Sequence, residues 1–206
     1  MNKFKFVEIN CPICGKNNTI FIGHNGGNYH PNKKGLESKI YKCRECSLFY
    51  PNPLPIPENI QNIYKNANDY FSYYASQNWE IRIKEHKKTL QKLLNIKKNK
   101  LEKNKNYKLL EIGSGRGDFL KSCKDYSNID AVGIEISDDF IKYAKNKKIN
   151  IEKKDLDQFI SENKKFDFIV MIAVIEHLIN PDECIKKVTE ILNKDGIIYI
   201  DCPQEP

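Results

Sequence analysis

The segment YKLLEIGSGRGDFL, residues 107–120, decides the fold of this 206-residue chain. Its first six residues are an apolar run long enough for one buried strand, and Gly113, Gly115 and Gly117 follow at every second position. A helical pattern then begins at Asp118. Glycines permit positive φ angles and let the backbone approach a ligand closely. The segment therefore predicts a strand, a ligand-binding turn and a helix.

An acidic residue at the end of the next strand indicates the class of ligand. Ile134–Glu135–Ile136 reads as a second strand, and Glu135 lies 22 residues after Gly113. An acid at about this separation holds the ribose hydroxyls in nucleotide-binding α/β folds, so the spacing predicts a nucleoside derivative. The dinucleotide fingerprint G-x-G-x-x-G fails, because the residue three positions after Gly115 is Asp118. An NAD-dependent oxidoreductase is therefore the weakest alternative.

The pattern Glu111-x-Gly113-x-Gly115-x-Gly117 resembles the first motif of class I S-adenosylmethionine (SAM)-dependent methyltransferases. An acid before the glycines suits a ligand that carries an ammonium and a sulfonium, and it would repel a pyrophosphate. In this family an acid after the third strand commonly binds the adenine amino group, and Asp155 is the better match in Asp155-Leu156-Asp157. The resemblance covers residues 107–203 and implies SAM as cofactor. The residues that it implies for SAM binding are Glu111, Gly113, Gly115, Gly117, Glu135 and Asp155.

Strand and helix patterns alternate along the second half of the chain. Further strands are expected at 130–136, 149–152, 166–173 and 196–202, and helices at 138–147 and 181–192. Such alternation predicts an α/β fold with a parallel sheet covered by helices on both faces. Asp138 is expected to cap its helix, and Asn180–Pro181 to begin the next.

The resemblance also implies a Rossmann-like sheet with strand order 3-2-1-4-5. The family pattern continues to two more strands, and this sequence stops at Asp201-Cys-Pro-Gln-Glu-Pro. The domain is therefore expected to be truncated, with its last two strands missing. Its fifth strand, residues 196–200, would then be an apolar edge that promotes self-association.

The segment Ile175-Glu176-His177-Leu178 resembles the E-H-L signature of the same family. Ligands in open α/β sheets lie at the carboxyl ends of the strands, so His177 is expected near the chemistry. An imidazole suits removal of a proton from an oxygen or nitrogen acceptor, which makes His177 the candidate catalytic residue. Orientation of its loop is the alternative role. Some relatives bind a divalent metal through E-x-x-E-H, but Ala173 occupies the first position here, so no catalytic metal is predicted.

Two C-x-x-C pairs lie near the N-terminus, separated by 28 residues. Four thiolates at this spacing predict a tetrahedral zinc site, and a reducing cytoplasm makes metal a better explanation than disulfides. So short a segment has little core, so zinc would supply its folding energy in a structural role. His24 and His30, between the pairs, are expected to be loop residues. The predicted ligands are Cys11, Cys14, Cys43 and Cys46.

The segment at residues 41–53 is similar to a ribbon that precedes certain bacterial methyltransferases. Ser47 stands where that ribbon usually has glycine after its last cysteine. Four prolines between 51 and 57 are expected to stiffen the exit from the ribbon. The predicted domains are a zinc ribbon at 1–57, a helical linker and lid at 58–106, and a SAM-binding domain at 107–206.

The predicted linker has two parts. Residues 58–79 hold six aromatic side chains, which either cover the cofactor as a lid or pack between the domains. From Glu80 to Ile96, Ile83, Leu90 and Leu94 share one helical face, with Leu93 beside them. This helix is expected to lie against the sheet.

Charge is divided unevenly along the chain. Residues 1–107 hold 19 basic and 8 acidic side chains, whereas residues 108–206 hold 15 and 19. A basic front half leaves an RNA-directed methyltransferase as an alternative. The ribbon has no basic-aromatic stripe, however, so nucleic acid is a weak candidate partner.

The leading hypothesis is a methyltransferase for a small molecule or a sugar. The sugar is included because the ribbon resembles the one found in enzymes of bacterial glycan clusters. A SAM- and zinc-binding protein without turnover is the other alternative. With no membrane-length apolar run and no signal sequence, the expected location is the cytoplasm.

Overall fold

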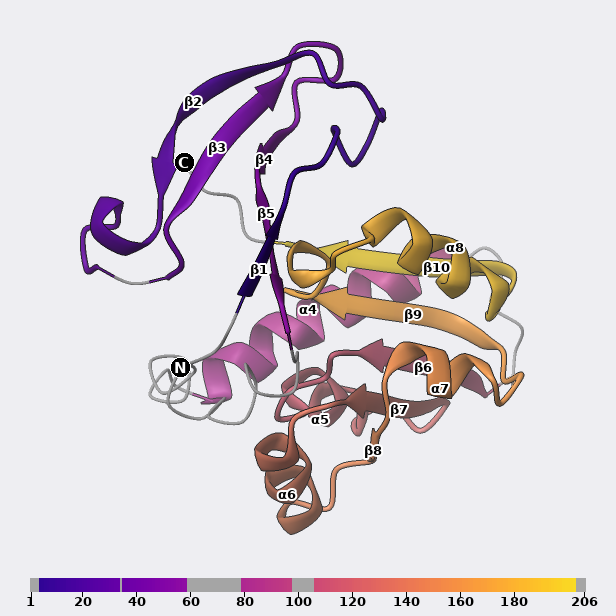
Figure 1. The fold of residues 1–206 in the computed structure, drawn as a ribbon. Coiled ribbons are helices and arrows are strands. Elements are labelled where there is room, and N and C mark those ends of the chain that lie inside the picture. Colours follow the sequence, from indigo (N-terminus) through magenta and orange to yellow (C-terminus); the bar gives the residue numbers. More distant parts are fainter. Residues whose placement is uncertain (1–3, 34, 59–78, 98–105, 203–206) are drawn as a thin grey trace. The chain divides into compact units, whose positions relative to one another are not determined.

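The computed structural model describes residues 4–33, 35–58, 79–97 and 106–202. The chain divides into two compact units, Met1–Ile63 and Tyr64–Pro206 (Figure 1). The aromatic segment that we expect to act as a lid or as packing lies almost entirely outside the described residues. The helix predicted within the linker is present as α4 (Trp79–Lys97), and it belongs to the second unit.

The first unit contains two small antiparallel sheets. A three-stranded sheet is formed by β2 (Thr19–Asn25), β3 (Ser38–Cys43) and β4 (Phe49–Pro51). A second sheet pairs β1 (Phe4–Val7) with β5 (Leu54–Pro57). The proline-rich exit is therefore more than a stiff connector, because part of it is a strand. Proline fits there because β5 pairs only with β1 among the described strands and needs few backbone donors.

The core of the first unit is very small. Cys11, Cys43 and Tyr50 are buried, and Ile9, Cys14 and Leu48 pack against them. Cysteines thus make up half of this cluster. A segment with so little apolar burial needs another source of stability.

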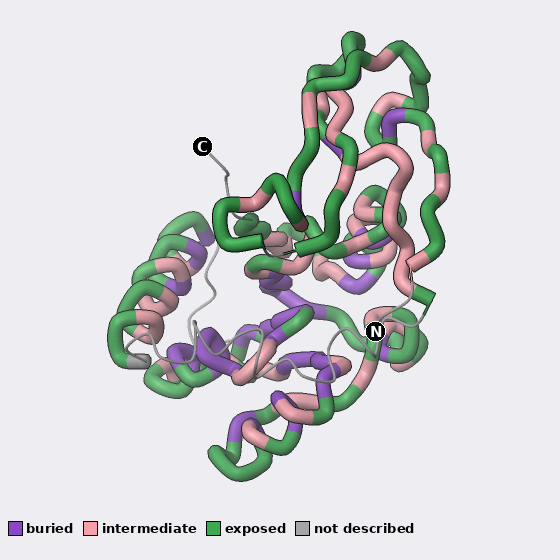
Figure 2. The backbone as a smooth tube through the Cα atoms, turned by 60° about the vertical axis from the view of Figure 1, so that its left-hand side comes forward, coloured by how far each residue is buried: buried purple, intermediate pink, exposed green. Residues whose placement is uncertain are grey.

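The second unit is built on a five-stranded parallel sheet in the order β8-β7-β6-β9-β10. In chain order this is 3-2-1-4-5, so the predicted fold class and strand order are confirmed. The strands are β6 (Tyr107–Ile112), β7 (Ile129–Glu135), β8 (Ile151–Lys153), β9 (Phe166–Ile172) and β10 (Leu192–Asp201). β6 is central, paired with β7 on one side and β9 on the other, and its residues are nearly all buried (Figure 2).

Helices and two apolar clusters cover the sheet. One cluster joins Leu90 and Leu93 of α4 to Tyr107 and Leu109 of β6, as the helical periodicity predicts. The other lies on the opposite face and includes Leu110. Alternate residues of β6 thus enter opposite clusters, as the two-residue period of a strand requires. The remaining helices are α5 (Asp118–Cys123), α6 (Asp138–Asn146), α7 (Leu156–Ile160) and α8 (Pro181–Glu190).

Several local details differ from the sequence-based expectations. β10 begins at Leu192, inside the helix expected at 181–192, because α8 ends at Glu190. The N-cap of α6 is Ser137, not Asp138, which lies in the first turn and pairs with Lys153. The short helix α7 is additional to the predicted elements. β8 begins two residues later than expected, at Ile151. Within the described ranges, no helix combines the length and apolarity needed to cross a membrane.

Candidate functional site

The glycine turn between β6 and α5 presents one open surface. Gly113, Gly115 and Gly117 all have positive φ, at 64°, 53° and 78°. A Cβ added to Gly113 would lie 2.6 Å from Val174, and one added to Gly117 would lie 2.6 Å from Ile149. A Cβ added to Gly115 would have no neighbour within 4 Å in the part of the chain that the structure describes. Packing therefore requires two of the glycines, whereas the third borders space in which a ligand can approach the backbone.

Glu135 organises this turn from the end of β7. Its Oε2 accepts the Gly115 N–H at 2.8 Å, and its Oε1 accepts the N–H groups of Ile136 at 2.8 Å and Ser137 at 2.9 Å. The residue is only 7% exposed. Glu135, which is predicted to bind the ribose hydroxyls, thus lies directly beside Gly115. Its backbone hydrogen bonds hold the tips of β6 and β7 together.

Glu111 is a buried acid without a full set of partners. It lies on the face of β6 shared with Tyr107 and Leu109, and it is 5% exposed. Its Oε2 has no hydrogen-bond partner among the described residues. Burial, followed by the negative charges of Asp118 and Glu135, raises the pKa of Glu111 well above its usual value. The carboxyl group therefore keeps its proton at pH values where an exposed glutamate is ionised, and a bound cation would favour its ionised form.

Two arginines and an aspartate lie beside the glycine turn, although the sequence motif did not indicate them as site residues. Arg82 Nε lies 3.3 Å from Asp118 Oδ2, and Arg116 Nη2 lies 3.4 Å from the same oxygen. Asp118 is 6% exposed, and its Oδ1 is buried with no hydrogen-bond partner in the described part of the chain. A sequence signal for Arg82 exists, because it precedes Leu90 and Leu93 by 8 and 11 residues and shares their helix face.

His86, on α4, is a further residue beside this turn that no sequence motif indicated. It lies one helical turn after Arg82, and its ring meets the Phe119 ring edge-on at 5.7 Å. Burial, followed by the positive charge of Arg82, lowers the pKa of His86 below its usual value. The imidazole is therefore neutral at neutral pH.

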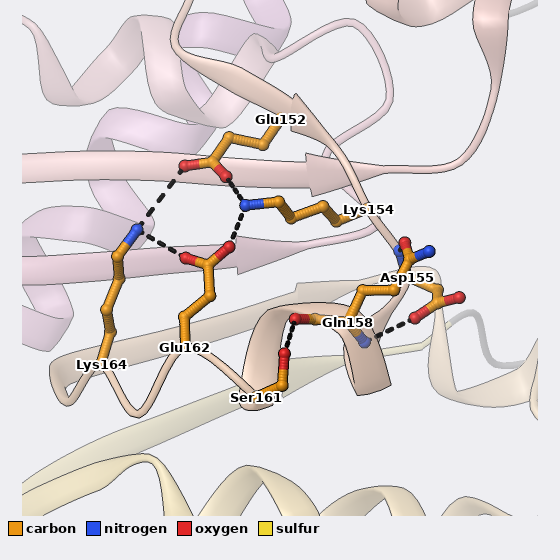
Figure 3. A network of polar contacts seen from close by, with 7 residues as sticks. All are labelled: Glu152, Lys154, Asp155, Gln158, Ser161, Glu162 and Lys164. Atoms are coloured by element: carbon orange, nitrogen blue, oxygen red, sulfur yellow. Dashed lines mark hydrogen bonds and ion pairs between the residues drawn. The ribbon is translucent and has the colours of Figure 1, made fainter.

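Asp155 has a defined structural role at the end of β8 (Figure 3). It is the N-cap of α7, and its Oδ1 accepts the Gln158 N–H at 2.8 Å. Gln158 Oε1 in turn accepts the Asp155 N–H at 3.0 Å, which completes a capping box. Beside it, Lys154 pairs with Glu152 and Glu162. Adenine recognition by Asp155 stays a prediction, and it would have to coexist with this cap.

His177 lies at the carboxyl end of β9, in the short helix η3 (Ile175–His177). Its side chain is 47% exposed, and Nε2 is 3.8 Å from Glu176 Oε1. Val174, three residues earlier, packs against Gly113. The segment is therefore at the same edge of the sheet as the glycine turn, although a catalytic role for His177 stays a prediction.

The four predicted zinc ligands lie together in the first unit. The sulfurs of Cys11, Cys14, Cys43 and Cys46 all lie within 4.8 Å of one another. Cys11 Sγ lies 3.4 Å from Cys46 Sγ, and Cys14 Sγ lies 3.5 Å from Cys43 Sγ. Tetrahedral zinc, with Zn–S bonds of about 2.3 Å, requires sulfurs about 3.8 Å apart. The cluster therefore fits a four-thiolate zinc site with small adjustments. His24 lies in β2 and stacks on Tyr29, so the expected loop position is wrong for this residue. His30 lies outside the strands and accepts the Asn32 N–H, as a loop residue can.

The two cysteine pairs have the same backbone geometry. The Cys11 N–H donates to the Lys16 carbonyl, and the Gly15 N–H donates to the Cys11 carbonyl. The Cys43 N–H and the Ser47 N–H make the equivalent bonds in the second pair. Gly15 has φ 70° and Ser47 has φ 63°. The serine therefore occupies a left-handed position that favours glycine.

We expect Ser47→Gly to stabilise the ribbon by roughly 0.5–1 kcal/mol, because glycine removes the left-handed strain at a smaller entropic cost. Gly15→Ser, the reverse change in the equivalent position, should destabilise it by a similar amount. Chelator-induced unfolding of the two variants, followed by circular dichroism, measures both effects. Equal stability of Ser47→Gly and the wild type would contradict the strain assigned to this position.

Known proteins and a protein family are similar to the second unit of this chain. A family described as "Methyltransferase domain" matches residues 79–206. The ubiquinone biosynthesis O-methyltransferase of Pelagibacter ubique (strain HTCC1062) is 35% identical over 101 residues, which are 47% of this chain and 42% of that protein. A probable (S)-tetrahydroprotoberberine N-methyltransferase 2 of Papaver bracteatum is 25% identical over 100 residues, covering 45% and 28%. The chain thus spans less than half the length of these curated relatives.

The solved structures show the same fold. The plantazolicin methyltransferase BpumL in complex with SAH (S-adenosylhomocysteine) superposes with a TM-score of 0.54 at 22% identity, covering 69% of this chain and 53% of that one. BamL, in complex with a triazolic desmethylPZN analog and SAH, gives a TM-score of 0.51 at 21% identity, with 68% and 56% covered. At these identities the likeness establishes the fold alone.

Proposed function

We propose that this chain, which belongs to the methyltransferase domain family, binds SAM at the glycine turn and transfers the methyl group to an acceptor. The observation that carries the proposal is the open side of Gly115, whose N–H donates to the buried Glu135. A second buried acid, Glu111, lies in β6 just before the turn. Glu135 is placed for the ribose hydroxyls. Glu111 is placed for the positive charges of the cofactor. Asp155, at the end of the neighbouring strand β8, is assigned to the adenine.

Methyl transfer from SAM mainly requires that the protein position the cofactor and the acceptor. Bound SAM supplies a methyl group already activated by its sulfonium. The chain's residues must orient it toward the acceptor and exclude water. An oxygen or nitrogen acceptor must also lose a proton, and we assign the removal of this proton to His177, at the same edge of the sheet. Its exposed imidazole is accessible to an acceptor.

We infer a small-molecule or sugar acceptor. The similar curated proteins are named as O- and N-methyltransferases, which supports a small molecule. The sugar depends on the resemblance of the ribbon to glycan-cluster enzymes. Self-association through β10, which pairs only with β9 among the described strands, and a cytoplasmic location also stay predictions.

We assign one structural zinc ion to Cys11, Cys14, Cys43 and Cys46. The sulfur separations support this assignment, and so does the small apolar core of the first unit. All four positions are filled by protein thiolates, which leaves no open site for substrate. The metal would therefore hold the fold and take no part in methyl transfer.

Gly115→Ala tests the cofactor site. Isothermal titration calorimetry of the wild type should show binding of SAH and no binding of NAD. The added methyl group would occupy the open space beside Gly115, so we expect affinity for SAH to fall at least tenfold. A left-handed alanine costs about 1–2 kcal/mol of stability. Gly35→Ala is the matched control, because Gly35 also has positive φ, and its Cβ would have only one neighbour within 4 Å, at 3.8 Å.

The control variant should lose similar stability and keep full affinity for SAH. If the wild type binds NAD, or if Gly115→Ala binds SAH as well as the wild type does, the cofactor assignment is wrong. Thermal unfolding of both variants separates loss of the site from loss of the fold.

A further inference from the structure

The three-stranded sheet of the ribbon (Figure 1) and the turn that follows β2 carry four aromatic rings in a continuous strip. Phe21 of β2 and Tyr41 of β3 are cross-strand partners, and their ring centres are 5.6 Å apart. The His24 ring lies 5.3 Å from Phe21, and Tyr29, in the short helix η1 (Gly27–Tyr29), stacks on His24 at 4.4 Å. Phe21 and Tyr29 are 46% and 55% exposed, and none of the four residues enters the core cluster described for the ribbon. This aromatic strip is therefore available to a partner.

A β-bulge in β2 builds the aromatic strip. Side chains three positions apart on a regular strand point to opposite faces of a sheet. The register of β2 shifts after Phe21, so Ile22 is left without a partner in β3. Phe21 lies opposite Tyr41, and His24 lies opposite Lys39. Because Tyr41 and Lys39 are two positions apart, they share a face of β3. The bulge thus places Phe21 and His24 on one face, with a lysine beside them.

The charge of the ribbon favours an anionic partner. Residues 1–57 hold eight basic and three acidic side chains. In the second unit, Lys154, Lys164 and Lys187 each pair with two carboxylates. The basic side chains that the structure describes in the ribbon form no ion pair with a described residue, and they are Lys5, Lys16, Lys33, Lys39, Lys42 and Arg44. An anion can therefore approach them without displacing a carboxylate.

We propose that the aromatic strip binds single-stranded nucleic acid. Unpaired bases stack on exposed aromatic rings, and basic side chains attract the phosphates between them. His24 covers one face of the Tyr29 ring, and the exposure of Tyr29 leaves room for a base on the other. Lys39, opposite His24, is placed for a phosphate. The sequence shows no basic-aromatic stripe, because these residues come together only when β2 pairs with β3. Binding at the strip needs no SAM, so this inference goes beyond the proposed function and does not depend on it.

Fluorescence anisotropy of the full chain, with zinc and without SAM, tests the proposal. The probes are labelled oligouridine and oligodeoxythymidine of about 12 nucleotides, a typical length for a single-strand site. At least one of them should bind, and their comparison shows whether the strip prefers RNA or DNA. An RNA duplex of the same length hides its base faces, and inorganic polyphosphate has none. Both should bind at least about tenfold more weakly than the preferred single strand, because they lack the stacking.

Two substitutions separate stacking from charge. Tyr29→Ala should weaken binding at least about fivefold at every salt concentration, which corresponds to the loss of one stacked base. Tyr29→Phe keeps the ring and should bind as the wild type does. Lys39→Gln should make the dependence of log K on log salt less steep by about 0.7, the value for one phosphate contact on a single strand. Lys16→Gln is the matched control, because Lys16 is exposed and precedes β2, whereas Tyr29 follows it. It should change neither the affinity nor the slope.

Metal analysis of each variant distinguishes a lost contact from a lost ribbon fold. If neither single strand binds, or if Tyr29→Ala keeps its zinc and binds as well as the wild type, the proposal is wrong. Equally tight binding of the duplex or of polyphosphate would show that the ribbon attracts polyanions by charge alone, and it would also overturn the proposal.

Discussion

Cys43→Ser is expected to release the metal and unfold the ribbon while the methyltransferase unit stays folded. Binding of structural zinc contributes about 10–16 kcal/mol in small zinc modules, which exceeds what the small core of the first unit can supply. Cys43 is fully buried at the centre of that core, so its loss removes a ligand and a packing contact together. The second unit has its own sheet and two apolar clusters, and neither cluster includes any of the four predicted zinc ligands.

Metal analysis and limited proteolysis measure the two parts of this expectation. The wild type should hold about one equivalent of zinc, as one four-thiolate site requires, and residues 1–57 should resist protease. Cys43→Ser should hold none and lose that resistance. Cys202→Ser changes an exposed cysteine outside the cluster and should behave as the wild type. A metal-free protein with a protease-resistant ribbon would refute the zinc assignment.

Glu111→Gln is expected to stabilise the ligand-free protein at neutral pH and to weaken SAM binding at least tenfold. A buried carboxyl group whose pKa is raised destabilises the fold wherever the unfolded chain is ionised. Each unit of upward shift costs about 1.4 kcal/mol at a pH above both pKa values. Glutamine removes this cost because it stays neutral at every pH. It also removes the negative charge assigned to the ammonium and sulfonium of the ligand.

The pH dependence gives the sign of this effect. The unfolded chain loses the Glu111 proton near pH 4.5, whereas the folded chain keeps it to higher pH. The folded state therefore binds more protons, and the contribution of Glu111 to stability falls as the pH rises above about 4.5. Glu111→Gln and the wild type should have equal stability at lower pH and diverge above it.

Chemical denaturation at several pH values, with and without SAM, measures this divergence. The exposed Glu190→Gln is the control and should follow the wild type throughout. A less stable Glu111→Gln protein with unchanged affinity for SAM would show that Glu111 is ionised in the fold and structural in role.

Most of the second unit was predictable, because its signals are local. The apolar run at Tyr107–Ile112, the three glycines and the helical start at Asp118 all appear in the fold as expected. α7 could also have been found, since Asp155 and Gln158 have the spacing of a capping box. The five-residue helix was missed because it is too short to show a period.

The sequence by itself determined the parallel sheet, its strand order through the family resemblance, and the grouping of four cysteines. Each depends on periodicity or spacing along the chain, which a linear reading detects. Only the tertiary structure decided that Arg82 meets Asp118 and that Glu111 is left with a spare oxygen. It also decided that Gly115, and neither of its neighbours in the motif, borders open space. These features arise where α4, β9 and the glycine turn meet, and the energy of such contacts depends on distance in space, which no spacing in the sequence records.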